Sequence, residues 1–71
     1  MYYVYVLKIE NDFYIGYTKD LVQRIKQHKR EGNVQLVYYE AYQFDKLART
    51  REKKLKYHGS AWRGLRNRII A

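Results

Sequence analysis

Five side chains in this sequence are suited to acid–base chemistry, phosphate binding or metal binding, and they are Tyr5, Tyr14, Arg24, His28 and Glu52. Two phenol hydroxyls and an imidazole can handle protons, and the planar fork of a guanidinium can hold a phosphate. A single carboxylate can hold Mg²⁺, because this ion keeps several waters and takes few protein ligands. Hydrolysis of a phosphodiester needs these three capacities at one point. The fold must therefore bring the five residues together.

The positive charge of the chain lies in its last third. Residues 1–45 carry six bases and six acids, whereas residues 46–71 carry nine bases and one acid, Glu52. The formal net charge of +8 is therefore C-terminal, and such a surface attracts a polyanion by Coulomb forces and counterion release. The candidates for contact with nucleic-acid phosphates are Lys53, Lys54, Lys56, Arg63, Arg66 and Arg68. The alternative is that this charge only keeps a small basic protein soluble.

Length and composition exclude several classes of protein. A chain of 71 residues predicts one domain, residues 1–71, with a thin hydrophobic core. Without cysteine it has neither a disulfide framework nor a thiolate zinc site. The longest apolar run, near the start, is too short to span a bilayer and lacks the basic region and cleavage site of a signal peptide. We expect a cytoplasmic protein that does not bind membranes.

The first elements predict a β-hairpin. Residues 2–9 are rich in β-branched and aromatic types, and residues 13–17 continue this pattern after a polar turn. With Asn11-Asp12 as the central turn residues, Ile9 would pair with Tyr14. Side chains alternate along a strand, so this register separates two faces of the hairpin. One face would hold Tyr3, Tyr5, Leu7 and Tyr14, and the other Val4, Val6, Phe13 and Ile15.

The rest of the chain predicts three helices and one more strand. Asp20 is suited to cap a helix over about 21–31 that stops at Gly32, and its apolar side would be Leu21, Val22 and Ile25. A third strand is predicted over 36–42. Asp45 would cap a helix over about 46–57, with an inner side of Leu47, Ala48 and Leu55; Arg51 would pack its stem there and extend its head to water. Ser60 would cap a short last helix. The predicted fold is a mixed α/β domain, a three-stranded antiparallel sheet flanked by helices in the order β-β-α-β-α-α.

Four segments of the sequence resemble a known family. Tyr14-Ile15-Gly16 is the second half of the signature of the GIY-YIG nucleases, and Tyr3-Val4-Tyr5 stands where the first half belongs. The segment 21–28 resembles the family helix that carries an arginine and a histidine, and the segment 48–56 resembles the helix that carries its glutamate. The similarity runs from Tyr2 to about Ile69 and is closest to the small, freestanding, single-domain members.

The resemblance implies a role for each candidate residue. Tyr5 matches the tyrosine that activates the attacking water, and Tyr14 matches the second tyrosine lining the site. Arg24 matches the arginine that holds the phosphate, and His28 matches a histidine that many members carry. Glu52 matches the carboxylate that binds Mg²⁺ or Mn²⁺. Some relatives have an asparagine after this glutamate; Asn67 is the one candidate here, and we leave it outside the core site.

Each of these residues also has a purely structural interpretation. Strand tyrosines usually pack their rings, and a histidine at a helix border is usually a surface residue. Glu52 could form an i,i+4 ion pair with Lys56, worth about 0.3–0.5 kcal/mol. Arg24 could pair with Asp20 in the same way.

The hypothesis from the sequence is a metal-dependent endonuclease that hydrolyses DNA phosphodiesters with Mg²⁺ or Mn²⁺. Its substrate would be selected by DNA structure, such as branches or damage, by a partner protein, or hardly at all, and RNA is not excluded. The first alternative is a DNA- or RNA-binding module of the same fold with weak or no catalysis. A second is a protein-interaction domain that uses exposed tyrosines. The sequence leaves the oligomeric state open.

Overall fold

The computed structural model describes residues 1–70, which form three strands and three helices. The elements are β1 (Tyr2–Ile9), β2 (Asp12–Thr18), α1 (Leu21–Glu31), β3 (Val34–Tyr42), α2 (Asp45–Tyr57) and α3 (Gly59–Ile70). The predicted order β-β-α-β-α-α and the antiparallel sheet are confirmed. In this part of the chain no helix has the length and hydrophobicity that a membrane crossing requires.

The sheet has β1 at its centre, with β2 and β3 as its two edges. The predicted hairpin register is wrong by two residues, since Ile9 pairs with Asp12, and Tyr14 pairs with Leu7. The turn falls one residue earlier because Glu10 takes a left-handed backbone conformation, with φ 56°. A shift of two residues leaves every side chain on its expected face. Tyr5 and Tyr14 therefore still share a face.

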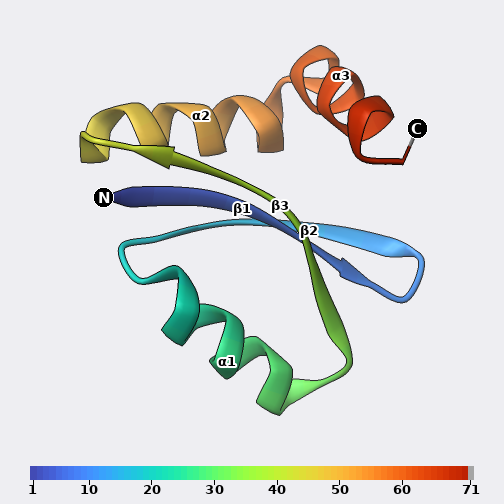
Figure 1. Cartoon of the computed structure of the whole chain (residues 1–71). Helices are drawn as coiled ribbons and strands as arrows, with labels where there is room; N and C mark the ends of the chain where they lie inside the picture. Colours follow the sequence, from blue (N-terminus) through green and yellow to red (C-terminus); the bar gives the residue numbers. More distant parts are fainter. Residues whose placement is uncertain (71) are drawn as a thin grey trace.

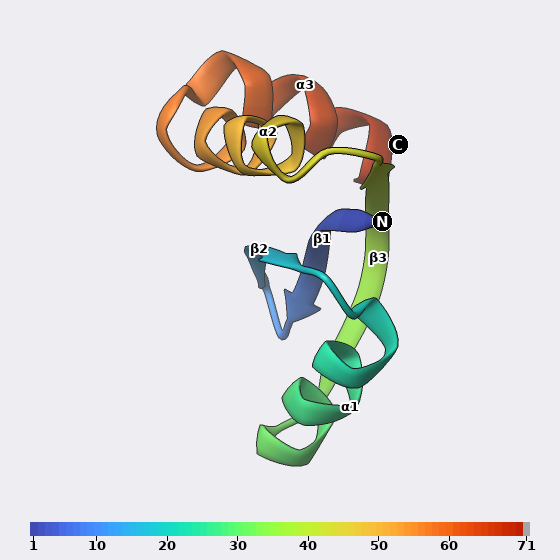
Figure 2. The same cartoon turned by 90° about the vertical axis from the view of Figure 1, so that its left-hand side faces the viewer.

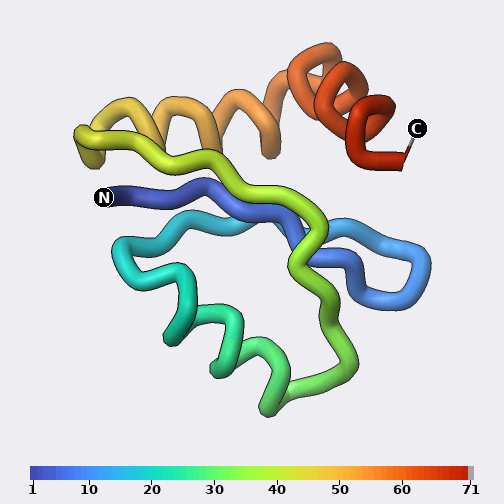
Figure 3. Tube along the Cα trace, in the orientation of Figure 1, coloured from blue at the N-terminus to red at the C-terminus, as the bar shows by residue number. Residues whose placement is uncertain are grey.

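The helices lie on both sides of the sheet. Helix α1 covers one side, and α2 and α3 cover the other (Figures 1 and 2). Strand β3 ends beside the N-terminus, and α2 then runs back along the sheet (Figure 3). Helix α2 consequently contacts both β1 and β2. A residue on α2 can thus act beside the edge strand β2.

The hydrophobic core lies between the sheet and the helices α2 and α3. Its buried residues are Val4, Val6, Ala48, Leu55 and Leu65. Leu47 is 52% exposed, so the prediction that it faces inward is wrong. On the opposite side, Tyr5 and Leu7 are buried, but no residue of α1 is, and Val22 is 67% exposed. Helix α1 therefore covers the face of Tyr5 loosely.

The helix ends differ in part from the prediction. Asp20 caps α1 as expected, because its carboxylate accepts a hydrogen bond from the backbone of Gln23. Asp45 does not cap α2: it is the first helical residue, and its carboxylate accepts from Tyr17 Oη and Arg49 Nε instead. The remaining differences are small. Strand β3 begins at Val34, and α3 begins at Gly59, so Ser60 lies inside its first turn.

Candidate active site

Tyr5 crosses the edge strand where that strand has no side chain. It sits in the centre of β1, is 1% exposed, and pairs with Gly16 of β2. A Cβ atom at position 16 would stand 2.3 Å from Tyr5 Cζ and 2.4 Å from Tyr5 Oη. The glycine therefore gives the phenol its space, and the hydroxyl lies over β2. A glycine within a strand often marks such a close approach, and here the approaching group is the side chain of Tyr5.

Tyr5, Tyr14 and His28 form one cluster on the side of the sheet that α1 covers. Tyr5 Oη lies 3.1 Å from Nε2 of His28. The ring centroid of Tyr14 is 6.3 Å from that of Tyr5 and 5.3 Å from that of His28. Tyr14 is itself 41% exposed whereas Tyr5 is buried, so the cluster meets solvent at Tyr14. Three of the five predicted residues are thus in mutual contact.

The surroundings of Tyr5 keep its hydroxyl protonated. Burial is the main cause that raises the pKa of Tyr5 to about 12, and the neighbouring Tyr14 and the negative charge of Glu52 raise it further. The positive charge of Arg24 acts in the opposite direction. Arg24 stands on α1 and Glu52 on α2, on opposite sides of the sheet. Both charges nevertheless act on the pKa of the same phenol, with opposite effects.

Glu52 and Arg24 have different immediate neighbours. The side chain of Glu52 is 21% exposed, and its Oε2 lies 3.2 Å from Lys56 Nζ, which is the ion pair that the spacing allowed. Arg24 is exposed at a cavity of about 390 Å³ beside the end of β2. Within residues 1–70 it forms no ion pair with Asp20. The guanidinium of Arg24 is thus available to an anion.

A second ionic cluster fixes the helix that carries Glu52. Glu40 on β3 accepts hydrogen bonds from Tyr38 Oη at 2.6 Å and Tyr42 Oη at 2.7 Å. Its carboxylate also accepts from Arg51, the residue before Glu52, with Nε at 3.0 Å and Nη2 at 3.1 Å. The prediction that Arg51 extends its head to water is therefore wrong. Burial raises the pKa of Glu40, but these four hydrogen bonds outweigh it and hold the pKa below its ordinary value.

One part of this cluster is indicated by the sequence. Tyr38, Glu40 and Tyr42 alternate along a strand and so share a face. The helical spacing also places the stem of Arg51 on the inner side of its helix. Their meeting could not be predicted, because it depends on how α2 crosses the sheet.

The side chains available as metal ligands suit a hard cation that keeps most of its bound water. Within residues 1–70 no three His, Cys, Asp or Glu side chains lie close enough to hold a metal ion together. Glu52 is the carboxylate whose negative charge raises the pKa of Tyr5. One carboxylate suits Mg²⁺ or Mn²⁺, which retain water, and does not suit a closed zinc site.

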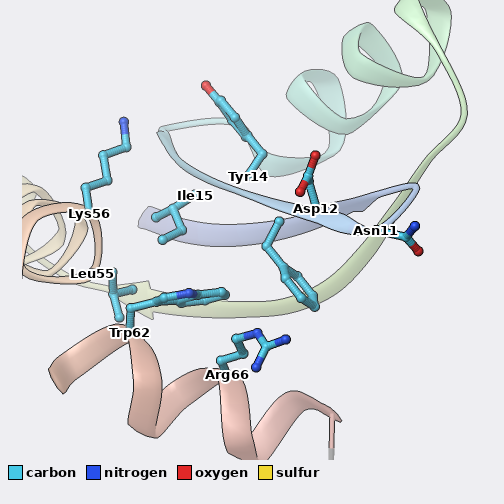
Figure 4. A pocket seen from close by; sticks show the side chains of 9 residues that line it. Asn11, Asp12, Tyr14, Ile15, Leu55, Lys56, Trp62 and Arg66 are labelled. Carbon is cyan, nitrogen blue, oxygen red and sulfur yellow. The ribbon is translucent and has the colours of Figure 1, made fainter. Parts of the chain in front are cut away.

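The six basic residues predicted to contact phosphates are all exposed. Two of them, Lys56 and Arg66, line a cavity of about 530 Å³ between β2 and the helices α2 and α3 (Figure 4). Tyr14 borders the same cavity, so the cavity adjoins the cluster of Tyr5, Tyr14 and His28. The sequence did not predict this cavity.

Comparison with known proteins agrees with this architecture. The family model described as the GIY-YIG catalytic domain matches residues 1–67. The chain is also similar to the UPF0213 protein CPE1444 of Clostridium perfringens (strain 13 / Type A). The two are 36% identical over 66 residues, an alignment that covers 79% of this chain and 71% of that protein. No solved structure matches the chain.

Proposed function

The chain belongs to the GIY-YIG family, and from this premise we propose that it is a divalent-metal-dependent endonuclease that hydrolyses DNA phosphodiesters. The domain has a nuclease-type fold. The observation that supports the proposal most directly is the 3.1 Å contact between Tyr5 Oη and His28 Nε2, in the field of Arg24 and Glu52. A buried phenol with a proton acceptor on one side and opposite charges nearby is typical of an acid–base site.

Tyr5 and His28 act as a proton relay in this proposal. With the neutral imidazole protonated on Nδ1, Nε2 accepts the hydroxyl proton of Tyr5. The phenol passes this proton on as it takes one from the attacking water. Its pKa of about 12 makes a free phenolate scarce at neutral pH, so a relay suits it better than prior ionisation. The water oxygen attacks phosphorus, and the leaving oxygen takes a proton from solvent.

Arg24, Tyr14 and Glu52 handle the charge of the phosphate. The exposed guanidinium of Arg24 binds non-bridging oxygens, and the partly exposed hydroxyl of Tyr14 donates a hydrogen bond to the phosphate. Glu52 would hold Mg²⁺ or Mn²⁺, which supplies positive charge beside the scissile group when bound. The basic residues of α2 and α3 hold flanking phosphates and carry little sequence information.

The test is cleavage of branched and linear DNA with Mg²⁺ or Mn²⁺ by wild type, Glu52→Gln and Glu31→Gln. Glu31 is an exposed glutamate at the end of α1, so its variant loses the same charge away from Tyr5. We expect Glu52→Gln to lose cleavage and Glu31→Gln to keep it. Equal cleavage by all three proteins would refute the role of Glu52. Salt-sensitive binding without any turnover would instead indicate a binding module.

A further inference from the structure

We propose that the cavity between β2 and the helices α2 and α3 binds an unpaired nucleobase of the strand that is cut. The inference rests on the proposed function, since it concerns the substrate of the same site. The cavity volume of about 530 Å³ falls within the range of small-molecule sites. The cavity reaches from the β-hairpin turn at Asn11 to Arg66 on α3.

The walls of the cavity offer aromatic faces and an apolar floor. Phe13 and Trp62 meet edge to face, with ring centroids 5.5 Å apart and planes at 62°. Both rings are half-buried, and Ile15 and the buried Leu55 lie beside them (Figure 4). Proteins bind unpaired bases by stacking them on such side chains. This aromatic and apolar part of the lining suits a planar base.

The polar groups around the cavity also favour a base. The guanidinium carbon of Arg66 lies 5.8 Å from the ring centroid of Phe13, so a flat cation stands beside the aromatic wall. Asn11, in the hairpin turn, and Asp12, the first residue of β2, contribute an amide and a carboxylate. The carboxylate repels phosphate oxygens, but it accepts hydrogen bonds from the N–H groups of a base edge. Lys56 and Arg66 supply the positive charge for the backbone of the same nucleotide.

The position of the cavity connects it to the candidate active site. Tyr14 borders the cavity from β2, while its ring points to the opposite side of that strand from Trp62 (Figure 4) and contacts His28. Lys56 lines the cavity and pairs with Glu52. The bound base therefore belongs to a nucleotide next to the scissile phosphate. A base in duplex DNA must leave its stack to enter, whereas a base in a flap or single strand enters without this cost. The cavity thus favours DNA that is unpaired at the cleavage site.

Trp62 is the one tryptophan of the chain and reports directly on this cavity. Its fluorescence would be titrated, in EDTA, with three short DNAs: an ordinary single strand, a strand of equal length made of abasic sites, and a duplex hairpin. We expect the ordinary strand to quench Trp62 and to bind roughly tenfold more tightly than the abasic strand, because stacking is lost without bases. Equal affinity for the two strands, or equal quenching by the duplex, would overturn the proposal.

A pair of variants separates base binding from general charge. Arg66→Gln and Arg63→Gln each remove one exposed positive charge from α3, but only Arg66 lines the cavity. Both variants should bind all DNA more weakly. Only Arg66→Gln should reduce the preference for the ordinary strand over the abasic strand. An equal preference in the two variants would contradict the assignment.

Failure of this inference can be told apart from failure of the proposed nuclease. The titration needs neither metal nor cleavage, and it can be repeated with Glu52→Gln. If the protein prefers ordinary to abasic strands but shows no cleavage that depends on Glu52, the base site is supported and the proposed nuclease activity is refuted. Glu52-dependent cleavage without that preference would keep the nuclease and remove the base site.

Discussion

The side chain of Tyr5 occupies the space that a side chain of Gly16 would fill. A Cβ at position 16 would lie 2.3 Å from Tyr5 Cζ, closer than real Cβ contacts allow. The neighbouring atoms belong to a buried ring in the central strand, so the ring has little room to move away. Tyr5 of the first sequence motif and Gly16 of the second therefore form one steric unit.

Gly16→Ala should consequently damage both stability and cleavage. We expect a loss of about 1–3 kcal/mol in the free energy of unfolding, typical of an overpacked site, and a displaced Tyr5 hydroxyl. The matched control is Gly64→Ala in α3, where a Cβ meets nothing within 4 Å. That change should be neutral or stabilise by up to about 1 kcal/mol. Urea denaturation of both variants measures the difference, and equal stabilities would show that the predicted clash is absorbed.

Tyr5→Phe and His28→Ala should slow cleavage, each by about 10²- to 10⁴-fold, if the two residues pass a proton between them. Because they act as a unit, the double variant should be hardly slower than either single variant. His58→Ala is the control, since His58 is exposed and lies after the end of α2. Single-turnover rates test this. If the rate loss of the double variant equals the product of the two single losses, the 3.1 Å contact carries no proton.

The high pKa of Tyr5 predicts a loss of stability in alkali. The phenol of the unfolded chain ionises near pH 10.0, whereas that of the folded protein ionises near 12. Between these values the unfolded state has released a proton that the folded state keeps, so the free energy of unfolding falls as pH rises. In Tyr5→Phe part of this fall should disappear. Carbon-13 NMR of labelled tyrosine, with Tyr5 assigned from the variant, should give its midpoint near 12; a midpoint near 10 would contradict the burial argument.

The sequence was sufficient for the elements and for the faces of the strands. Alternating side chains repeat every two residues, so Tyr5 and Tyr14 share a face in the observed register as well as in the predicted one. The register itself was wrong because Asn11 and Asp12 have the strongest turn preferences, whereas Glu10 takes the left-handed conformation. Local preference indicated that a turn exists but not which residue would begin it.

Contacts between distant elements could not be predicted in the same way. The meeting of Tyr5 with His28 followed from the resemblance to a family, since spacing alone does not bring β1 to α1. The pairing of Arg51 with Glu40 and the cavity beside Trp62 depend on how α2 and α3 cross the sheet. No periodicity encodes such a crossing, so these features appear only in three dimensions.

The Glu40 cluster predicts a loss of stability in acid. The pKa of Glu40 in the folded protein lies below its ordinary value of 4.5, so the cluster stabilises the fold above that pH. This contribution is lost as pH falls through the folded pKa. Glu40→Gln should lower the free energy of unfolding by about 1–3 kcal/mol at pH 7 and flatten its dependence on pH below 4.5. The exposed Glu31→Gln should do neither, and an unchanged acid limb in Glu40→Gln would show that other carboxylates cause it.

If Glu52 binds a divalent cation as proposed, Lys56 competes with that cation for the carboxylate. Lys56 Nζ lies 3.2 Å from Glu52 Oε2, and the ammonium must move or share the carboxylate when a metal binds. Lys56→Met keeps the apolar stem and removes this competitor, at a stability cost below about 0.5 kcal/mol. We expect the affinity for Mn²⁺, measured by electron paramagnetic resonance without DNA, to rise about twofold to fivefold. Lys54→Met removes the same charge from an exposed position on the same helix, so it controls for the general field. Equal Mn²⁺ affinities in the two variants would mean that the cation does not use the carboxylate of Glu52.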